Sequence, residues 1–87
     1  MSTPGPQEQL DEFFEYMAKF AQKHSAIAQS FMTLTGNVMQ DGALKAKEKE
    51  LIALGIAVGL RCSSCICAHT KAALGHGATP DEILEAA

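Results

Sequence analysis

The stretch "LIALGIAVGLRCSSCICAHTKAALGHG", residues 51–77, decides the fold of this 87-residue chain. Its first ten residues are apolar all round, which indicates a helix that is buried on every side. With the charged "KAKEKE" before them, the helix is expected over residues 45–60. Gly55 and Gly59 share one face, where another helix can approach closely at a cost of about 1 kcal/mol each in helix propensity. That cost indicates tight packing, of the kind found across a subunit interface.

The cysteine-containing part of the stretch predicts a further helix over residues 63–74, with the cysteine pair at its N-terminus. The sequence "GHG" ends this helix. Gly75 or Gly77 suits the left-handed position that often follows a helix, because glycine has no Cβ to clash there. His76, between them, is expected to be a helix-end residue.

The N-terminal half also has helical periodicity. From residue 7, apolar residues recur at spacings of three and four, which is typical of one helix face. The first face consists of Leu10, Phe13, Phe14, Met17, Phe20 and Ala21, and a second consists of Ile27, Phe31, Leu34 and Val38. The break between them lies near His24 and Ser25, and Ser25 is a candidate N-cap. Asp41 and Gly42 are expected to end the second helix.

The C-terminal end predicts a fifth helix. "TPDE", residues 79–82, has the layout of a capping box, with Thr79 as N-cap, Pro80 at N1 and Glu82 at N3. No strand pattern occurs anywhere, so the fold class is all-α. Residues 1–6 are expected to be a flexible tail, and residues 7–87 a single helical domain.

Composition limits the classes of protein. A chain of 87 residues buries only about 60–65% of its unfolded surface, yet 47% of its residues are hydrophobic. Such a chain is expected to complete its core by forming an oligomer. The net charge of −3 argues against nucleic-acid binding. No signal peptide is recognisable, and the longest apolar stretch is shorter than the roughly 20 residues that span a bilayer. We therefore expect a cytoplasmic protein without membrane contact.

Three cysteines and a histidine lie close together between residues 62 and 69. A helix advances about 100° per residue, so Cys62, Cys65 and His69 fall within about 60° of one another and share a face. Cys67 lies about 200° from Cys65 on the same geometry. It is expected to be a small buried hydrophobe, the usual role of free cysteine.

Three functions of such a cluster fit poorly. Haem attachment requires histidine directly after the second cysteine, where this chain has Ile66. Structural zinc requires four ligands, and the shared face offers three; the fourth would have to be His76, His24 or a carboxylate. A thioredoxin-type pair is expected beside a βαβ pattern, which is missing.

A reactive thiol pair fits best. The unpaired N–H groups of a helix N-terminus favour thiolate over thiol, and this argument favours Cys62. A histidine one turn along can accept a thiol proton, and this argument favours Cys65, because His69 is its neighbour on the helix surface. The spacing alone does not decide which thiol attacks.

Residues 47–86, "KEKELIALGIAVGLRCSSCICAHTKAALGHGATPDEILEA", resemble the carboxymuconolactone decarboxylase superfamily, and within it the AhpD-like alkylhydroperoxidase branch. That branch carries a glutamate and, about a dozen residues later, C-x-x-C-x-x-x-H. The matching residues here are Glu50, Cys62, Cys65 and His69. The resemblance covers roughly residues 41–86. The decarboxylase branch lacks the cysteine pair, so lactone decarboxylation is not expected.

The resemblance implies a function. Cys65 would be the peroxidatic cysteine and Cys62 the resolving one, so that the oxidised enzyme holds a disulfide. His69 and Glu50 would relay the proton. The enzyme would need no metal and no organic cofactor. A dithiol or lipoyl-protein donor would reduce it, and the family forms trimers and hexamers.

Several points stay open at this stage. The short N-terminal region and the early end of the last helix indicate a minimal or truncated member of the family. Cys67 is extra to the motif and offers an alternative disulfide. A non-enzymatic metal-binding or redox-sensing module, using Cys62, Cys65 and His69, is the alternative to a peroxidase.

Overall fold

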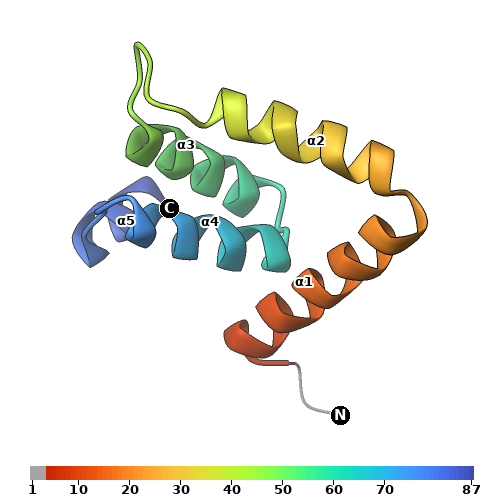
Figure 1. The fold of residues 1–87 in the computed structure, drawn as a ribbon. Coiled ribbons are helices and arrows are strands. Elements are labelled where there is room, and N and C mark those ends of the chain that lie inside the picture. The colour runs from red at the N-terminus through yellow and green to blue at the C-terminus, as the bar shows by residue number, and fades with distance from the viewer. Residues whose placement is uncertain (1–3) are drawn as a thin grey trace.

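A computed structural model describes residues 4–87, and these form five helices and no strand (Figure 1). The helices are α1 (Pro6–Lys23), α2 (Ser25–Val38), α3 (Ala46–Gly59), α4 (Ser63–Gly75) and α5 (Pro80–Ala86). The all-α prediction is confirmed. Of the expected flexible tail, residues 1–3 lie outside the described range, and Pro6 is already the first residue of α1. Proline suits that position because the first helical N–H has no partner within the helix.

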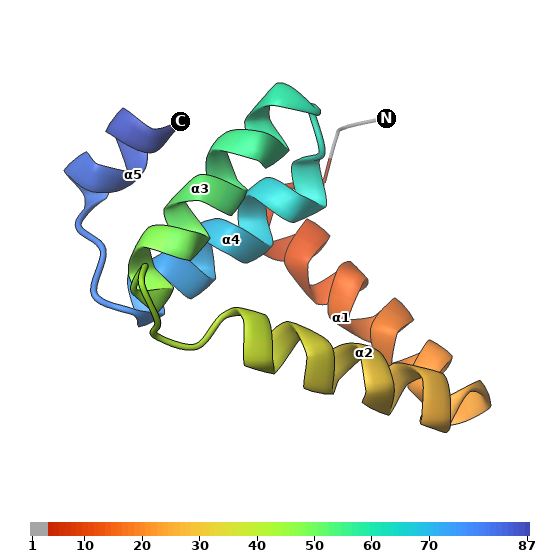
Figure 2. The ribbon, with the colours of Figure 1, turned by 90° about the horizontal axis from the view of Figure 1, so that it is seen from above.

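The centre of the fold is the antiparallel pair α3 and α4, which pack side by side (Figures 1 and 2). Leu54 and Ala57 of α3 are buried, as is Ala73 of α4, which is completely covered. α5 returns along α3, and its end comes close to Gly55. A Cβ at Gly55 would lie 3.2 Å from the backbone oxygen of Ala86. The predicted close approach is therefore real at Gly55, and it occurs within one chain.

The expectation that residues 51–60 are buried on every side is wrong for the single chain. Ile52, Ile56 and Leu60 are 51%, 58% and 75% exposed. They lie four residues apart and form one stripe along α3. α4 and α5 cover other sides of the helix, and nothing within 4 Å would meet a Cβ at Gly59. This stripe has no partner within residues 4–87.

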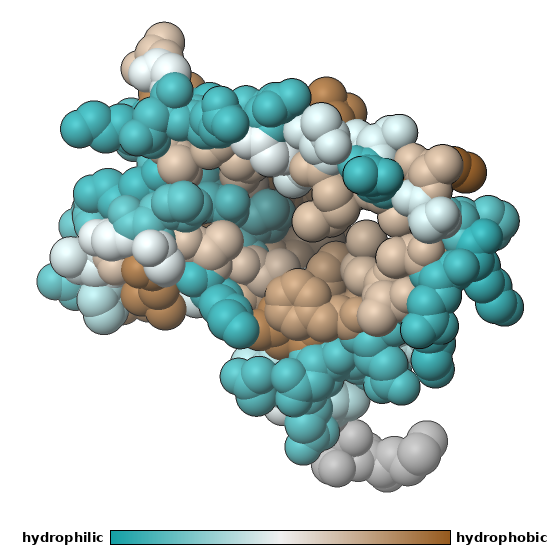
Figure 3. Space-filling model, viewed as in Figure 1, coloured by the Kyte–Doolittle hydropathy of each residue, from teal (hydrophilic) through white to brown (hydrophobic). Residues whose placement is uncertain are grey.

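The α2 helix packs along α1, and in the described range its link to α3 is a bond from Lys49 to its last residue, Val38. Its expected apolar face is largely exposed in consequence, at Ile27, Phe31, Leu34 and Val38. The Cα radius of gyration is 13.9 Å, whereas about 12 Å is typical of a compact chain of this length. Figure 3 shows a hollow lined by apolar residues between α2, α1 and the central pair. The chain is thus open on this side.

Two helix ends follow the sequence prediction, whereas the start and the end of α2 do not. Gly77 has the left-handed φ of 89° expected after α4. Thr79 and Glu82 form both hydrogen bonds of the capping box at the start of α5. Ser25, expected to be an N-cap, is instead the first residue of α2; His24 is the N-cap residue and makes no side-chain capping bond.

The α2 helix also ends earlier than predicted, at Val38 rather than at residues 41–42. The reason lies in a tertiary contact. The Lys49 ammonium group of α3 donates hydrogen bonds to the carbonyl oxygens of Val38 and Gln40, at 2.7 and 2.6 Å. These bonds satisfy carbonyl groups at the end of α2, where helical partners are missing.

Candidate active site

The turn that positions the cysteines lies directly after α3. Arg61 adopts a left-handed φ of 55°, which is uncommon for a residue with a side chain. The N–H of Arg61 donates to Val58 O and the N–H of Cys62 donates to Ala57 O, both at 3.1 Å. This pair of bonds is a Schellman motif with arginine in place of the usual glycine. It reverses the chain sharply and makes Cys62 the N-cap residue of α4.

Cys62 and Cys65 are joined by a disulfide across the first turn of α4. Their Cα atoms are 5.2 Å apart, which is within the range that disulfides require. Both residues are half-buried. The predicted placement of the pair at a helix N-terminus is confirmed.

Glu50 and His69 form the second part of the site. Glu50 is the one charged residue that is buried in the described range, at 7% exposure. Its Oε2 lies 2.7 Å from His69 Nδ1. An ionised carboxylate only accepts hydrogen bonds, so Nδ1–H donates, and Nε2 is the ring nitrogen left to accept a proton. A buried carboxylate requires such a partner, because desolvation without one is costly.

The structure joins the four predicted residues in two pairs, Cys62 with Cys65 on α4 and Glu50 of α3 with His69 of α4. His69 lies one turn after Cys65, so their side chains are neighbours on α4. The carboxylate of Glu50 orients the imidazole from the other helix. Chemically, the site combines a disulfide-bonded cysteine pair with a histidine that is hydrogen-bonded to a buried carboxylate.

The remaining cysteine and histidines lie outside this arrangement. Cys67 is a free thiol. It is half-buried rather than fully buried, which corrects the sequence prediction. It lines a groove between α1 and α4 that is separate from the disulfide. His76 follows the last residue of α4, as predicted, and His24 separates α1 from α2.

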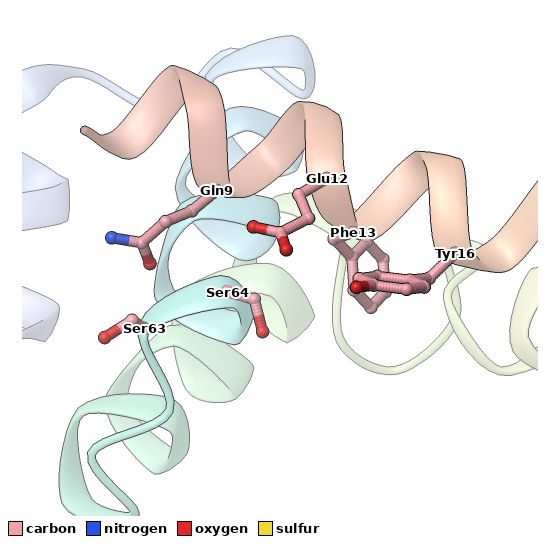
Figure 4. A pocket seen from close by; sticks show the side chains of 6 residues that line it. All are labelled: Gln9, Glu12, Phe13, Tyr16, Ser63 and Ser64. Carbon is pink, nitrogen blue, oxygen red and sulfur yellow. The ribbon is translucent and has the colours of Figure 1, made fainter. Parts of the chain in front are cut away.

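A pocket of about 350 Å³ lies between α1 and the first turn of α4 (Figure 4). Sequence reasoning missed it. The α1 residues that line the pocket recur at spacings of three and four, so they share one side of the helix. Of these residues, only Phe13 belongs to the apolar face from which the helix was predicted. The lining residues are Gln9, Glu12, Phe13 and Tyr16 of α1 and Ser63 and Ser64 of α4.

The described residues contain neither a metal-ligand cluster nor a membrane-spanning helix. Within residues 4–87, no three His, Cys, Asp or Glu side chains are grouped so that they could hold a metal ion. In the same part of the chain, no helix has both the length and the apolar character that crossing a bilayer demands.

Comparison with known proteins gives the family. The model of the carboxymuconolactone decarboxylase family matches residues 25–87. An apo crystal structure of a carboxymuconolactone decarboxylase family protein from Legionella pneumophila superimposes with a TM-score of 0.87 at 32% sequence identity, covering 93% of this chain and 72% of that one. This chain therefore belongs to the carboxymuconolactone decarboxylase family.

Two curated relatives are similar in sequence. An uncharacterized protein of Cupriavidus necator is 36% identical over 76 residues, which are 87% of this chain and 67% of that protein. Uncharacterized protein 4 in the cox locus of Paracoccus denitrificans is 40% identical over 62 residues, 71% of this chain and 56% of that protein. The chain thus spans about half to two thirds of the length of the curated relatives it matches.

Proposed function

We propose that this chain is a thiol-dependent peroxidase of the AhpD-like type, a disulfide oxidoreductase that reduces hydroperoxides through Cys65 and Cys62. One observation carries the proposal. The Cys62–Cys65 disulfide lies at the start of α4, and one turn along the same helix His69 is hydrogen-bonded to the buried Glu50. Membership of a family that includes AhpD-like peroxidases supports this function.

In the oxidative step, the Cys65 thiolate attacks the terminal oxygen of a hydroperoxide. The O–O bond breaks, the substrate leaves as an alcohol, and Cys65 becomes a sulfenic acid. The Cys62 sulfur then attacks Cys65 Sγ. A disulfide forms and water leaves, so that the two thiols have supplied two electrons to the peroxide.

His69 and Glu50 serve the proton transfers of this step. The free Nε2 of His69 removes the Cys65 proton and returns it to the departing alkoxide. Glu50 holds the imidazole by its Nδ1–H and stabilises the imidazolium that forms transiently. A carboxylate that is nearly excluded from water is effective in this role, because its field is weakly screened.

A dithiol or lipoyl-protein donor restores the two thiols, without a metal or an organic cofactor bound to the chain. We place the reaction in the cytoplasm, where free thiols are kept reduced. We further propose that the active form is a homo-oligomer, trimeric or hexameric, because the apolar surfaces of α2 and α3 are left uncovered by a single chain.

The direct test is turnover with several hydroperoxides, each with several dithiol donors. We expect peroxide-dependent oxidation of the donor and the loss of two thiols per chain on peroxide treatment. Mass spectrometry of the oxidised protein should show a Cys62–Cys65 link. Protein that retains all three thiols in excess peroxide would contradict the proposal.

Metal analysis separates this enzyme from the alternative, a non-enzymatic metal-binding or redox-sensing module that uses Cys62, Cys65 and His69. The disulfide occupies both sulfur donors, so a metal would have to bind the reduced protein. Stoichiometric zinc that blocks thiol titration in reduced protein would favour the alternative. A redox sensor without enzyme activity would form the disulfide but show no sustained turnover.

A further inference from the structure

The residue that follows α3 has a strained backbone. Arg61 is the one residue other than glycine that has a positive φ within residues 4–87. The left-handed position after α4 is occupied by Gly77, which has no Cβ to clash with a neighbouring carbonyl oxygen. Of these two left-handed helix ends, one therefore has the residue that suits the conformation and the other has an arginine, which is the less stable choice there.

The turn itself does not require the arginine side chain. Its two bonds are made by main-chain groups, from the N–H of Arg61 to Val58 O and from the N–H of Cys62 to Ala57 O. Glycine would make the same two bonds without strain. Since strained residues are concentrated at functional sites, a residue that is strained and dispensable for the turn indicates a function of its side chain.

The guanidinium group of Arg61 is available to a ligand. The side chain is exposed, and it forms no ion pair or hydrogen bond with any residue of the described range. By contrast, Lys19 and Lys47 pair with glutamates, and Lys49 donates to the end of α2. Arg61 is also the only arginine of the chain. Its N–H donors are thus free to bind an anion from solution.

The charges near the disulfide favour an anion at this position. No acidic residue occurs in residues 51–80, which include all of α4 and most of α3. Glu50, directly before them, is buried and already paired. Glu12 of α1, which lines the pocket beside α4, forms no ion pair with Arg61. The whole chain has a net charge of −3, so Arg61 is a local exception beside the cysteine pair.

The position of Arg61 brings its charge within reach of a molecule that reacts at Cys65. Neighbouring Cα atoms are about 3.8 Å apart, and those of Cys62 and Cys65 are 5.2 Å apart. The Arg61 Cα therefore lies within about 9 Å of the Cys65 Cα. The long arginine side chain can cover much of that distance, so its partner is an acidic group several bonds away from the reacting atom.

We propose that Arg61 determines substrate specificity, because its guanidinium group binds the carboxylate of an acidic organic hydroperoxide while the peroxide group reacts at Cys65. The planar guanidinium matches a carboxylate with two parallel N–H···O bonds. Arg61 forms no covalent bond and transfers no proton, so the electron and proton balance of the cycle is unchanged. The inference rests on the peroxidase proposed above, and it adds the chemical class of the substrate.

The test compares two hydroperoxides that differ by one carboxylate, cumene hydroperoxide and its para-carboxylate derivative. The ratio of their kcat/KM values measures recognition of the carboxylate. We expect the wild type to favour the acid by about fivefold at low ionic strength, the effect of one exposed ion pair. In about 1 M salt the preference should largely disappear, because the screening length falls to about 3 Å.

Three variants locate the preference. Arg61→Gly should reduce the ratio to about one or below, and it should be at least as stable as the wild type in thermal unfolding, because glycine relieves the strain. Arg61→Lys should keep part of the preference, since lysine retains the charge but not the two parallel bonds. Lys23→Gln is the matched control, because it removes one positive charge from the exposed end of α1 and should leave the ratio unchanged.

Three results would overturn the assignment. The first is a ratio in Arg61→Gly equal to that of the wild type. The second is an equal loss with both hydroperoxides, which would mean that the charge acts on the cysteines and not on the substrate. The third is a clear loss of stability in Arg61→Gly, which would mean that the arginine is retained for the fold.

A second measurement does not depend on turnover. Para-isopropylbenzoate carries the carboxylate without the peroxide group, and its binding to the oxidised protein is followed by nuclear magnetic resonance titration. Binding should be about fivefold weaker in Arg61→Gly and unchanged in Lys23→Gln, and equal binding in Arg61→Gly would refute the inference. If neither hydroperoxide is turned over but this difference is found, the proposed peroxidase fails and carboxylate binding by Arg61 stands.

Discussion

Glu50 Oε2 and His69 Nδ1 lie 2.7 Å apart and connect α3 to α4 over 19 positions of sequence. Glu50 is buried while the His69 side chain is 34% exposed. The carboxylate is therefore fixed inside the protein and the imidazole reaches outward from it. This bond is at once a stabilising contact of the central helix pair and the basis of the proposed proton relay, and two substitutions separate these functions.

Glu50→Gln should preserve the fold and lower peroxide turnover by about 100-fold or more, the usual contribution of positioned acid–base groups. The amide oxygen still accepts the His69 Nδ1–H bond, but it no longer stabilises an imidazolium. Steady-state kinetics with one peroxide checks this. Glu48→Gln, an exposed carboxylate two residues earlier on α3, should have wild-type activity. Equal activity in Glu50→Gln and Glu48→Gln would show that Glu50 is not part of the proton relay.

His69→Phe should lower the free energy of unfolding by about 1–3 kcal/mol, because the buried Glu50 loses its partner. Urea unfolding monitored by circular dichroism measures this change. In the double variant Glu50→Gln/His69→Phe, part of the stability should return, since an unpaired amide is less costly to bury than an unpaired carboxylate. If His69→Phe has the same free energy of unfolding as the wild type, the Glu50–His69 bond contributes nothing to stability.

The two redox cysteines should behave differently when each is replaced. Cys62→Ser should trap a sulfenic acid at Cys65, because the resolving thiol is missing, and mass spectrometry after dimedone labelling detects it. Cys65→Ser should abolish turnover. Cys67→Ser is the matched control, since that thiol lies outside the disulfide. Peroxide consumption at the normal rate by Cys65→Ser would show that the two roles are wrongly assigned.

The capping box of α5 predicts a pH dependence of stability. The backbone N–H of Thr79, first of all, and then the Lys47 ammonium group lower the pKa of Glu82 from its usual value of 4.5. A lowered pKa in the folded state means that the stabilisation is complete above pH 4.5 and is lost as the pH falls through the folded-state value.

Glu82→Gln should therefore reduce stability at neutral pH, and the difference from wild type should disappear in acid. Thermal unfolding measured from pH 7 down to pH 3 checks this. Glu85→Gln, on the same helix but outside the capping box, is the control. A difference that stays constant over that pH range would contradict the proposed cause.

The exposed apolar face of α2, formed by Ile27, Phe31, Leu34 and Val38, predicts self-association. Phe31→Lys, on the exposed apolar side of α2, should convert an oligomer into smaller species, because a buried, unpaired ammonium group is strongly unfavourable. Light scattering measures the mass. Gln29→Lys, on the polar side of the same helix, should leave the mass unchanged. A wild-type chain that is a stable monomer would contradict the proposed oligomer.

The sequence by itself determined the helices and the redox turn. Periodicity located the first two helices, and the apolar run, the "GHG" end and the capping box located the other three. The capping box at Thr79 was correct in both of its bonds, and Gly77, one of two candidates, has the left-handed backbone. The placement of Cys62 at the start of α4, one turn before Cys65, was equally predictable. Each of these features depends on residues a few positions apart, where helix geometry alone fixes the distances.

Only the tertiary structure decided the partner of Glu50, the apolar residues that stay uncovered, and the pocket beside α1. In the sequence Glu50 is only the last charged residue before an apolar run, and the family resemblance alone singles it out. Its bond to His69 exists because α3 and α4 pack antiparallel. The same packing leaves Ile52 and Ile56 uncovered and brings α1 against Ser63 and Ser64 to form the pocket. A hydrophobic pattern shows which residues avoid water, but the crossing of one helix over another decides what covers them.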